Sequence, residues 1–385
     1  MYKRVIQSKI EANSRNVLLL GPRQVGKSTL LSSLKPDLNI NLASPSVFRD
    51  YIAQPERFEA ELRASTPTTR TVFIDEVQKV PALLDAVQVL VDEDPKRFRF
   101  FLSGSSARKL RRGQANLLPG RIHRYDLHPL LERELGEEFN VERVLAHGTL
   151  PGVYAETDPS LRAQDLRGYV DAYLREEIQA EAFVRNLGGY ARLLDLVATC
   201  SGRVINVHAL CREAGISYET TRRYLEVLED TLLVFRVPAW SGTTRASLIA
   251  HPKYFFFDVG VRNALLRRPL DRCLDDERGL LLEHVFAQEL YGRMGVLWPD
   301  LALFHYRTRH GAEVDFVLQV GRELWAIEVK SSRLVSRSDL TGLQSFAERA
   351  KKVKRKIVVF LGPRKQQLGD IEVIPLRQFF EELPK

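Results

Sequence analysis

Residues 21–28 read Gly21-Pro22-Arg23-Gln24-Val25-Gly26-Lys27-Ser28, continue into Thr29, and match the pattern G-x-x-x-x-G-K-[ST] at every specified position. An apolar run over residues 16–20 precedes this stretch, and a helical pattern over residues 29–34 follows it. In such a strand–loop–helix segment, glycines let backbone N–H groups surround phosphate oxygens at the start of the helix. We therefore predict a phosphate-binding loop over Gly21–Thr29, in which Lys27 reaches the β- and γ-phosphates and Ser28 ligates Mg²⁺.

A second apolar run, over residues 71–74, ends in the acidic pair Asp75 and Glu76. A continuous apolar run is typical of a parallel strand that is buried on both faces. At the end of such a strand, Asp75 can hold Mg²⁺, directly or through water, and Glu76 can orient and deprotonate an attacking water. The alternative is a pair of solvated acids. The favoured interpretation is an ATPase with ATP and Mg²⁺ as cofactors and with Lys27, Asp75 and Glu76 as catalytic residues.

A third apolar run, over residues 99–102, ends in Ser103-Gly104-Ser105. Ligands bind at the carboxyl ends of parallel strands, so we expect Ser105 to contact the γ-phosphate, with Ser103 as the alternative. Residues 38–42 predict one more strand, lying between the phosphate loop and the acidic pair.

These features resemble the AAA-type ATPases, in which a strand separates the phosphate loop from the acidic strand and a glutamate adjoins the acidic aspartate. Residues 118–121 and 126–130 are further similar to a bacterial and archaeal group of these ATPases with a long, poorly characterised C-terminal region. The resemblance implies an arginine that acts on the γ-phosphate, in cis or from a neighbouring subunit, and a homo-oligomer. Arg121 is the candidate, and the basic cluster that surrounds it offers alternatives or a plain solvated surface: Arg108, Arg111, Arg112 and Arg124.

Length and turn residues predict three domains. A chain of 385 residues is too long for one ordinary core. A Gly/Pro cluster at residues 148–152 and a polar stretch at residues 269–277 suggest the boundaries. We therefore expect an AAA-type ATPase domain over 1–150, a helical region over 151–270 and a third domain over 271–385.

Composition narrows the environment and the partners. The three cysteines, Cys200, Cys211 and Cys273, form no C-x-x-C pair, which argues against a disulfide framework and a cysteine-based zinc site. No signal pattern and no apolar stretch of spanning length is found in the sequence, so we expect a cytoplasmic protein without membrane association. The formal net charge of +8 fits a polyanionic partner such as DNA. The basic run at residues 351–356 is either part of that surface or a solubilising strand flank.

The middle region contains a helix–turn–helix pattern. A short amphipathic helix over residues 207–214 is broken by Gly215, and Ser217 offers an N-cap for a second helix over residues 218–229. With the strand predicted at residues 232–237 as a wing, the pattern resembles winged-helix domains. Arg222 and Arg223 lie off the apolar stripe of the second helix, where they would contact DNA phosphates or guanine edges. The alternative is a winged helix that serves protein packing.

The last region combines four polar residues in a spaced pattern. Glu283 lies on a predicted helix, Asp315 on a strand, and Glu328 and Lys330 on the strand after the next turn. Strand alternation places Glu328 and Lys330 on one face and sets Asp315 opposite in phase to its apolar neighbours. The polar groups can therefore converge while the apolar side chains build a core.

This pattern resembles the PD-(D/E)XK nuclease fold, although Val314 stands where a proline is usual. The resemblance implies that Asp315 and Glu328 bind Mg²⁺, that Glu283 assists, and that Lys330 positions and activates the attacking water. Two alternatives remain: a hairpin with exposed charges, or a nuclease-like fold that only binds DNA.

The predicted fold class is α/β, with an AAA-type parallel-sheet ATPase core, a helical winged-helix middle region and a C-terminal mixed α/β nuclease-like domain. The first functional hypothesis is an ATP-hydrolysing, DNA-binding protein that couples turnover to DNA processing, with metal-dependent cleavage as a further activity. The second is a regulatory or signalling ATPase switch whose C-terminal domain only binds a partner. DNA-stimulated turnover distinguishes them.

Overall fold

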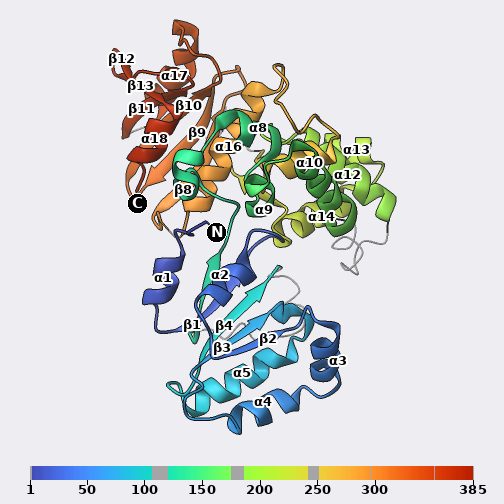
Figure 1. Ribbon diagram of the computed structural model, residues 1–385. Helices are drawn as coiled ribbons and strands as arrows, with labels where there is room; N and C mark the ends of the chain where they lie inside the picture. The colour runs from blue at the N-terminus through green and yellow to red at the C-terminus, as the bar shows by residue number, and fades with distance from the viewer. Residues whose placement is uncertain are drawn as a thin grey trace. The chain divides into compact units, whose positions relative to one another are not determined.

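The computed structural model describes residues 2–105, 120–174, 186–241, 251–295, 297–350 and 352–384 (Figure 1). The chain forms two compact units, residues 1–128 with 230–232 and residues 129–229 with 233–385. Both units combine helices with strands, which agrees with the predicted α/β class.

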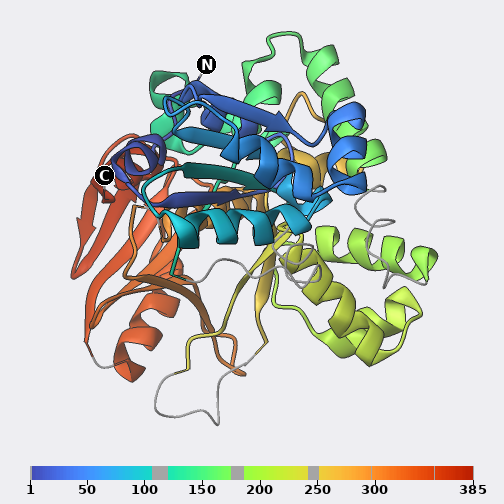
Figure 2. The ribbon, with the colours of Figure 1, turned by 90° about the horizontal axis from the view of Figure 1, so that it is seen from below.

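The first unit is built on one parallel sheet with the strand order β2-β3-β4-β1-β5 (Figure 1, and Figure 2 from below). Its elements are α1 (Gln7–Ala12), β1 (Asn16–Leu20), α2 (Lys27–Ser33), β2 (Leu38–Asn41), α3 (Pro45–Ala53), α4 (Glu56–Arg63), β3 (Thr71–Asp75), η1 (Val77–Lys79), α5 (Ala82–Glu93), β4 (Arg99–Gly104) and β5 (Ile122–Asp126). Every residue of β1 is buried, and β3 and β4 are buried after their first residue. The continuous apolar runs of the sequence therefore mark strands that are covered on both faces.

One prediction about this sheet needs correction. The strand that separates the phosphate-loop strand β1 from the acidic strand β3 is β4, which pairs with both of them. Strand β2, predicted to lie between the loop and the acidic pair, forms the sheet edge beyond β3. Its order along the chain does not give its order in the sheet, because parallel strands are joined by crossovers.

The middle part of the second unit is mainly helical. Its elements are α7 (Glu132–Leu135), η2 (Gly136–Glu138), α8 (Val141–His147), α9 (Pro151–Ala155), α10 (Pro159–Gly168), η3 (Tyr169–Leu174), α12 (Leu187–Thr199), α13 (Val207–Ala214), α14 (Tyr218–Asp230), β6 (Val234–Val237), β7 (Lys253–Phe256) and α15 (Val259–Leu265). Gly215 ends α13 with φ +66°, and the Ser217 hydroxyl accepts the Thr220 N–H at 3.1 Å at the start of α14. Strands β6 and β7 then pair antiparallel. The helix–turn–helix and the following strand are thus present where the sequence predicts them.

The C-terminal part of the second unit contains a mixed sheet with the order β12-β13-β11-β10-β9-β8. Its elements are α16 (Arg278–Arg293), β8 (Leu301–Arg307), β9 (Glu313–Val320), β10 (Glu323–Lys330), η5 (Arg337–Leu340), α17 (Thr341–Arg349), β11 (Val353–Phe360), β12 (Gln366–Leu368), β13 (Ile371–Pro375) and α18 (Leu376–Glu382). Helix α17 packs on β9, β10 and β11, and α16 packs on β10 and β7.

The middle and C-terminal regions pack as one unit, although the sequence suggests a boundary near residue 270. Trp240 donates its backbone N–H to His305 of β8 at 2.7 Å, which extends the middle region along the C-terminal sheet. Residues 129–150 also belong to this unit, since Gln288 of α16 donates to the Thr149 hydroxyl at 2.9 Å. The three-domain division itself stays a prediction.

His284 anchors helix α16 and gives the second unit a specific dependence on pH. Its Nε2 lies 2.7 Å from the Phe256 carbonyl oxygen, and burial lowers the pKa of His284 to about 3. Below about pH 6.5 the His284 side chain becomes protonated in the unfolded chain but stays neutral in the folded chain. The free energy of unfolding therefore falls, by about 2 kcal/mol at pH 5. Urea unfolding at pH 7.5 and pH 5.0 should therefore show a larger loss for the wild type than for His284→Gln, which cannot titrate. Equal losses in the two proteins would contradict this assignment.

Candidate functional site

Two glycines shape the phosphate loop between β1 and α2. Gly26 caps α2 with φ +92°, a backbone conformation that favours glycine. A Cβ at Gly21 would lie 2.3 Å from the Leu127 carbonyl oxygen, so no side chain fits at this position. The loop therefore has the backbone freedom and the close approach that a phosphate cradle requires.

Lys27 and Ser28 begin α2 and face the loop and the acidic strand. Lys27 is buried, and its Nζ donates to the carbonyl oxygens of Gly21 at 2.9 Å and Pro22 at 2.8 Å. The Ser28 hydroxyl donates to Asp75 Oδ1 at 2.8 Å. The structure thus brings together the predicted lysine, hydroxyl and carboxylate, which come from residues nearly fifty positions apart.

A chain of hydrogen bonds connects the ends of β3 and β4. The Ser103 hydroxyl donates to Asp75 Oδ1 and accepts the backbone N–H of Glu76 at 3.0 Å. Gln78 Nε2 donates both to Glu76 Oε2 and to the Ser105 hydroxyl, the latter at 3.0 Å. Both serines therefore lie beside the acidic pair, with Ser103 next to Asp75 and Ser105 connected to Glu76 through Gln78.

The donor set fits MgATP. A hydroxyl and a carboxylate that meet at 2.8 Å, Ser28 and Asp75, are hard oxygen ligands of the kind that Mg²⁺ prefers. When bound, Mg²⁺ would supply positive charge that neutralises the phosphates. Ser28 and Asp75 would hold the metal, Lys27 and the loop N–H groups would hold the phosphates, and Glu76 would orient the water.

Two residues of this site were missed in the sequence. Arg4 donates to the Val25 carbonyl oxygen in the phosphate loop and to the His128 carbonyl oxygen, both at 2.6 Å, and so braces the loop. Gln78 connects Glu76 to Ser105. Neither residue lies within a recognisable motif, and only Gln78, two residues after Glu76, is close enough in sequence to have been considered.

The place of Arg121 requires a correction. Arg121 directly precedes β5, whose parallel pairing sets Asn16 opposite Ile122 and Leu20 opposite Asp126. It therefore lies at the end of the sheet away from the phosphate loop, roughly 16 Å along the strand from Asp126 at about 3.3 Å per residue, and it forms an ion pair with Asp92 of α5. Arg121 cannot act on a γ-phosphate of its own subunit, and its action on a neighbouring subunit stays a prediction. Arg124 pairs with Asp126, and Arg108, Arg111 and Arg112 lie outside the described residues.

We expect Gln78 to act as a positioning residue for Glu76. Gln78→Ala removes the shared partner of Glu76 and Ser105 without touching the loop, so kcat should fall by about tenfold to a hundredfold, as for a small misplacement of a reacting group. The nucleotide Kd should stay unchanged, because Lys27 and Ser28 keep their contacts. Gln78→Glu is the matched variant, since it keeps the length of the side chain and places a second carboxylate beside Glu76. Steady-state turnover with fluorescent-nucleotide binding measures both quantities, and an unchanged kcat in both variants would remove Gln78 from the site.

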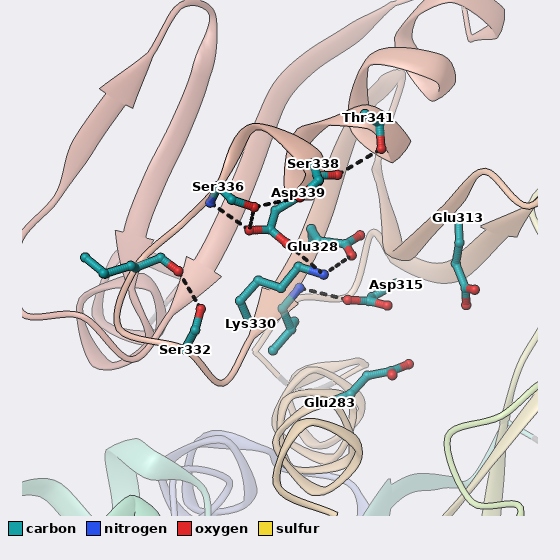
Figure 3. A network of polar contacts seen from close by, with 12 residues as sticks. Glu283, Glu313, Asp315, Glu328, Lys330, Ser332, Ser336, Ser338, Asp339 and Thr341 are labelled. Atoms are coloured by element: carbon teal, nitrogen blue, oxygen red, sulfur yellow. Dashed lines mark hydrogen bonds and ion pairs between the residues drawn. The ribbon is translucent and has the colours of Figure 1, made fainter. Parts of the chain in front are cut away.

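The polar residues of the C-terminal region also converge (Figure 3). The ladder between β9 and β10 ends with Phe316 opposite Ile327, so Asp315 and Glu328 follow on the same face. Lys330 Nζ bonds to Glu328 Oε1 at 2.8 Å and lies 3.6 Å from Asp339 Oδ1. Asp315 Oδ2 accepts the Val329 N–H at 2.8 Å. The relative phases predicted for these strands agree with this geometry.

A lysine that the sequence analysis did not identify enters this cluster from β7. Lys253 Nζ lies 2.7 Å from Glu283 Oε1, 3.0 Å from Glu313 Oε1 and 4.0 Å from Asp315 Oδ1. Its side chain is only 2% exposed. No motif surrounds Lys253 in the sequence, and its contacts depend on how β7 packs beside α16 and β9.

Burial and neighbouring charges shift the pKa values of the groups in this cluster. Burial by itself lowers the pKa of Lys253, but the carboxylates of Glu283, Asp315 and Glu313 outweigh it, so the pKa is raised. Burial raises the pKa values of Glu283, Asp315 and Glu328, and repulsion from neighbouring carboxylates, including Glu313, adds to the effect.

A divalent metal does not fit this cluster as it stands. Among the described residues, no group of three His, Cys, Asp or Glu side chains is arranged to hold a metal ion. Glu328 Oε2 is buried without a hydrogen-bond partner, but Lys253 already bonds to Glu283 and Glu313, so an ammonium group takes oxygens that a metal would need. Metal ligation by Glu283, Asp315 and Glu328 therefore stays a prediction that the geometry does not favour.

The basic residues predicted to meet DNA fall into two groups. Arg222 and Arg223 are exposed on α14, whereas Tyr224 and Leu225 beside them are buried. In the run at residues 352–356, by contrast, acidic neighbours accompany the basic side chains: Lys354 pairs with Glu323, Arg355 with Glu372 and Lys356 with Asp370. This pairing favours the interpretation of the run as a strand flank.

Three family models match consecutive parts of the chain. Residues 13–136 match a model described as an AAA domain, and residues 138–272 and 278–379 match two domains of unknown function, DUF8612 and DUF4143. The first unit is thus similar to AAA domains, which supports a P-loop ATPase of this type. The winged-helix and nuclease resemblances gain no support from these models. No helix in the described ranges has the length and apolar character needed to cross a membrane.

The chain is similar to proteins of uncharacterized function and, weakly, to several solved structures. An uncharacterized protein of Mycobacterium tuberculosis is 26% identical over 362 residues, covering 93% of this chain and 79% of the relative. An uncharacterized protein of Haemophilus influenzae is 23% identical over 276 residues, covering 64% and 68%. Thermotoga maritima RuvB is 17% identical with a TM-score of 0.29, covering 60% of this chain and 85% of that chain. The replication initiator DnaA bound to AMPPCP and single-stranded DNA is 13% identical with a TM-score of 0.24, covering 58% and 86%. At TM-scores this low, neither structure establishes the fold or the function of this chain.

Proposed function

We propose that this protein hydrolyses ATP and couples nucleotide turnover to the binding and processing of DNA. The observation that carries the ATPase assignment is the meeting of Ser28 with Asp75 beside the phosphate loop, with Glu76 next in the chain. The similarity of residues 13–136 to AAA domains supports the same assignment. In this proposal Lys27 binds phosphate oxygens, Asp75 and Ser28 hold Mg²⁺, Glu76 orients the water, and Ser105 contacts the γ-phosphate.

The proposal places DNA on helix α14. Arg222 and Arg223 are both exposed in the first half of the second helix of the helix–turn–helix, and the chain has a formal net charge of +8. Guanidinium groups in this position suit phosphates and guanine edges. A homo-oligomer is part of the proposal, because Arg121 can reach a γ-phosphate only in another subunit.

The proposal does not include cleavage by the C-terminal region. Cleavage by the route that the PD-(D/E)XK resemblance implies needs a divalent metal at Asp315 and Glu328. The buried ammonium of Lys253 lies beside that place instead. Metal-dependent cleavage therefore depends on the resemblance alone.

Turnover measured with a panel of DNA structures tests the proposal. Duplex, single-stranded, forked and four-way DNA are added to the full chain with MgATP, and at least one should raise kcat severalfold. Each reaction is also analysed for cut strands, with EDTA as the control. If DNA leaves turnover unchanged and does not bind, the coupling to DNA is wrong even where basal ATP hydrolysis is present.

The charge-filled C-terminal cluster favours a second candidate function, a regulatory ATPase switch whose C-terminal region only binds a partner. An acidic site that is balanced by its own lysines can serve as a structural core for a binding domain. In that case ATP should change the conformation of the chain, as seen by limited proteolysis, while no DNA of the panel changes turnover.

A further inference from the structure

Lys253 stands out among the buried charged residues because its ammonium lies in an acidic cluster from two other elements. Glu283 comes from α16, Glu313 and Asp315 come from β9, and Lys253 comes from β7. The N–O distances to the two glutamates are 2.7 Å and 3.0 Å, which are those of direct ion pairs. The middle region thus contributes a cation to the very carboxylates of the C-terminal region that resemble metal ligands.

The position of this ammonium conflicts with a divalent metal at the same carboxylates. Mg²⁺ binds oxygen ligands at about 2 Å, usually through one or two carboxylates with water completing the shell, so it needs carboxylate oxygens that are not already bonded to another cation. Lys253 already bonds to Glu283 and Glu313 and lies 4.0 Å from Asp315. A metal ion at this place would be repelled by the buried ammonium of Lys253. It could bind Glu283 and Glu313 only if their bonds to Lys253 were broken.

The surrounding cations extend the same arrangement. Lys330 bonds to Glu328 at 2.8 Å, and Arg307 lies 3.6 Å from Glu313. Each of the four carboxylates near the predicted metal site therefore has an ammonium or guanidinium group, or a backbone N–H, within reach. These ion pairs and hydrogen bonds compensate the negative charge of the carboxylates, which a metal ion would otherwise compensate.

We infer that Lys253 is the resident cation of this carboxylate cluster and that its ammonium keeps divalent metal ions out of the C-terminal region. The cluster is then a latent metal site, which opens only when the charge of Lys253 is removed or withdrawn. This inference is independent of the proposed ATPase and DNA functions, because it concerns only which cation the carboxylates bind.

Binding of Mn²⁺ to the full chain without nucleotide tests the inference. Lys253→Met keeps the apolar stem and removes the charge, so calorimetric titration should detect one additional Mn²⁺ per chain that the wild type lacks, with affinity at least tenfold above any wild-type binding in this region. The additional ion should disappear in the double variant Lys253→Met, Asp315→Asn. Lys253→Arg keeps the charge and should gain no ion. Any Mn²⁺ bound by Ser28 and Asp75 is common to all variants and cancels in the comparison.

Two further measurements keep the test decisive if Lys253→Met folds poorly. Mn²⁺ should raise the melting temperature of Lys253→Met. In the wild type, any change in melting temperature with Mn²⁺ should be no larger than the change in Asp315→Asn. If Lys253→Met does not fold, Asp315→Asn alone still decides, because with Lys253 in place it should bind as much Mn²⁺ as the wild type. Loss of a Mn²⁺ ion on this single substitution, or no additional ion in a folded Lys253→Met protein, would overturn the inference.

Discussion

Glu76→Gln should slow ATP turnover strongly and leave nucleotide binding in place. Glu76 is the carboxylate that follows the Ser28–Asp75 pair, and its backbone N–H is held by the Ser103 hydroxyl at 3.0 Å. The amide has the same shape and keeps most contacts, but it cannot accept a proton from water. General-base catalysis contributes about 10²-fold to 10⁴-fold, so kcat should fall by that factor while the ATP Kd changes little. Single-turnover hydrolysis and equilibrium binding of a fluorescent ATP analogue measure the two quantities.

The matched comparison is Lys27→Ala. Lys27 is buried at the start of α2 and bonds to the loop carbonyl oxygens, so its loss removes the charge that faces the β- and γ-phosphates. We expect ATP binding itself to weaken in this variant, in contrast to Glu76→Gln. Equal loss of binding in both variants would contradict this division of roles, and undiminished turnover in Glu76→Gln would contradict the site.

Local patterns predicted those parts of the structure that depend on a few neighbouring residues. The phosphate loop, the helix break at Gly215 and the phase of Asp315 and Glu328 all follow from spacing over fewer than twenty positions. Backbone conformation and strand alternation act at this range, so one sequence is sufficient to predict them.

Contacts between distant segments could not be predicted in the same way. Lys253 meets Glu283 and Asp315 only because β7 packs beside α16 and β9, and Arg4 meets Val25 and His128 only through the tertiary fold. Nothing in the spacing of these residues distinguishes them from surface cations. The same reason explains the error over β2, whose place at the sheet edge is decided by the crossovers and not by chain order.

The consequence for function is largest at Lys253. A spacing pattern identified the carboxylates that resemble metal ligands, but the cation beside them came from a different region of the chain. The spacing of residue types therefore shows that carboxylates can come together at one site. Which cation binds them depends on the residues that other parts of the fold place beside them.

Replacing Arg222 and Arg223 together with alanine should weaken DNA binding and flatten its dependence on salt. Both side chains are exposed on α14, and each phosphate contact releases counterions from DNA. The slope of log affinity against log salt should decrease by about 0.9 for each lost contact, hence by about 1.8 if both arginines contact phosphates. Fluorescence anisotropy of labelled DNA between 50 and roughly 200 mM salt, the range over which such contacts matter most, measures the slope.

The matched control is the double variant Arg322→Ala, Arg364→Ala, which removes two exposed positive charges from turns of the C-terminal sheet in the same unit. It has the same net charge as the α14 variant, so a difference between the two reports the position of the charge and not its amount. ATP turnover without DNA should be unchanged in both, since none of these residues belongs to the phosphate-loop site. If the α14 variant keeps the wild-type slope, or if both variants lose affinity equally, helix α14 is a packing element and DNA must bind through another surface.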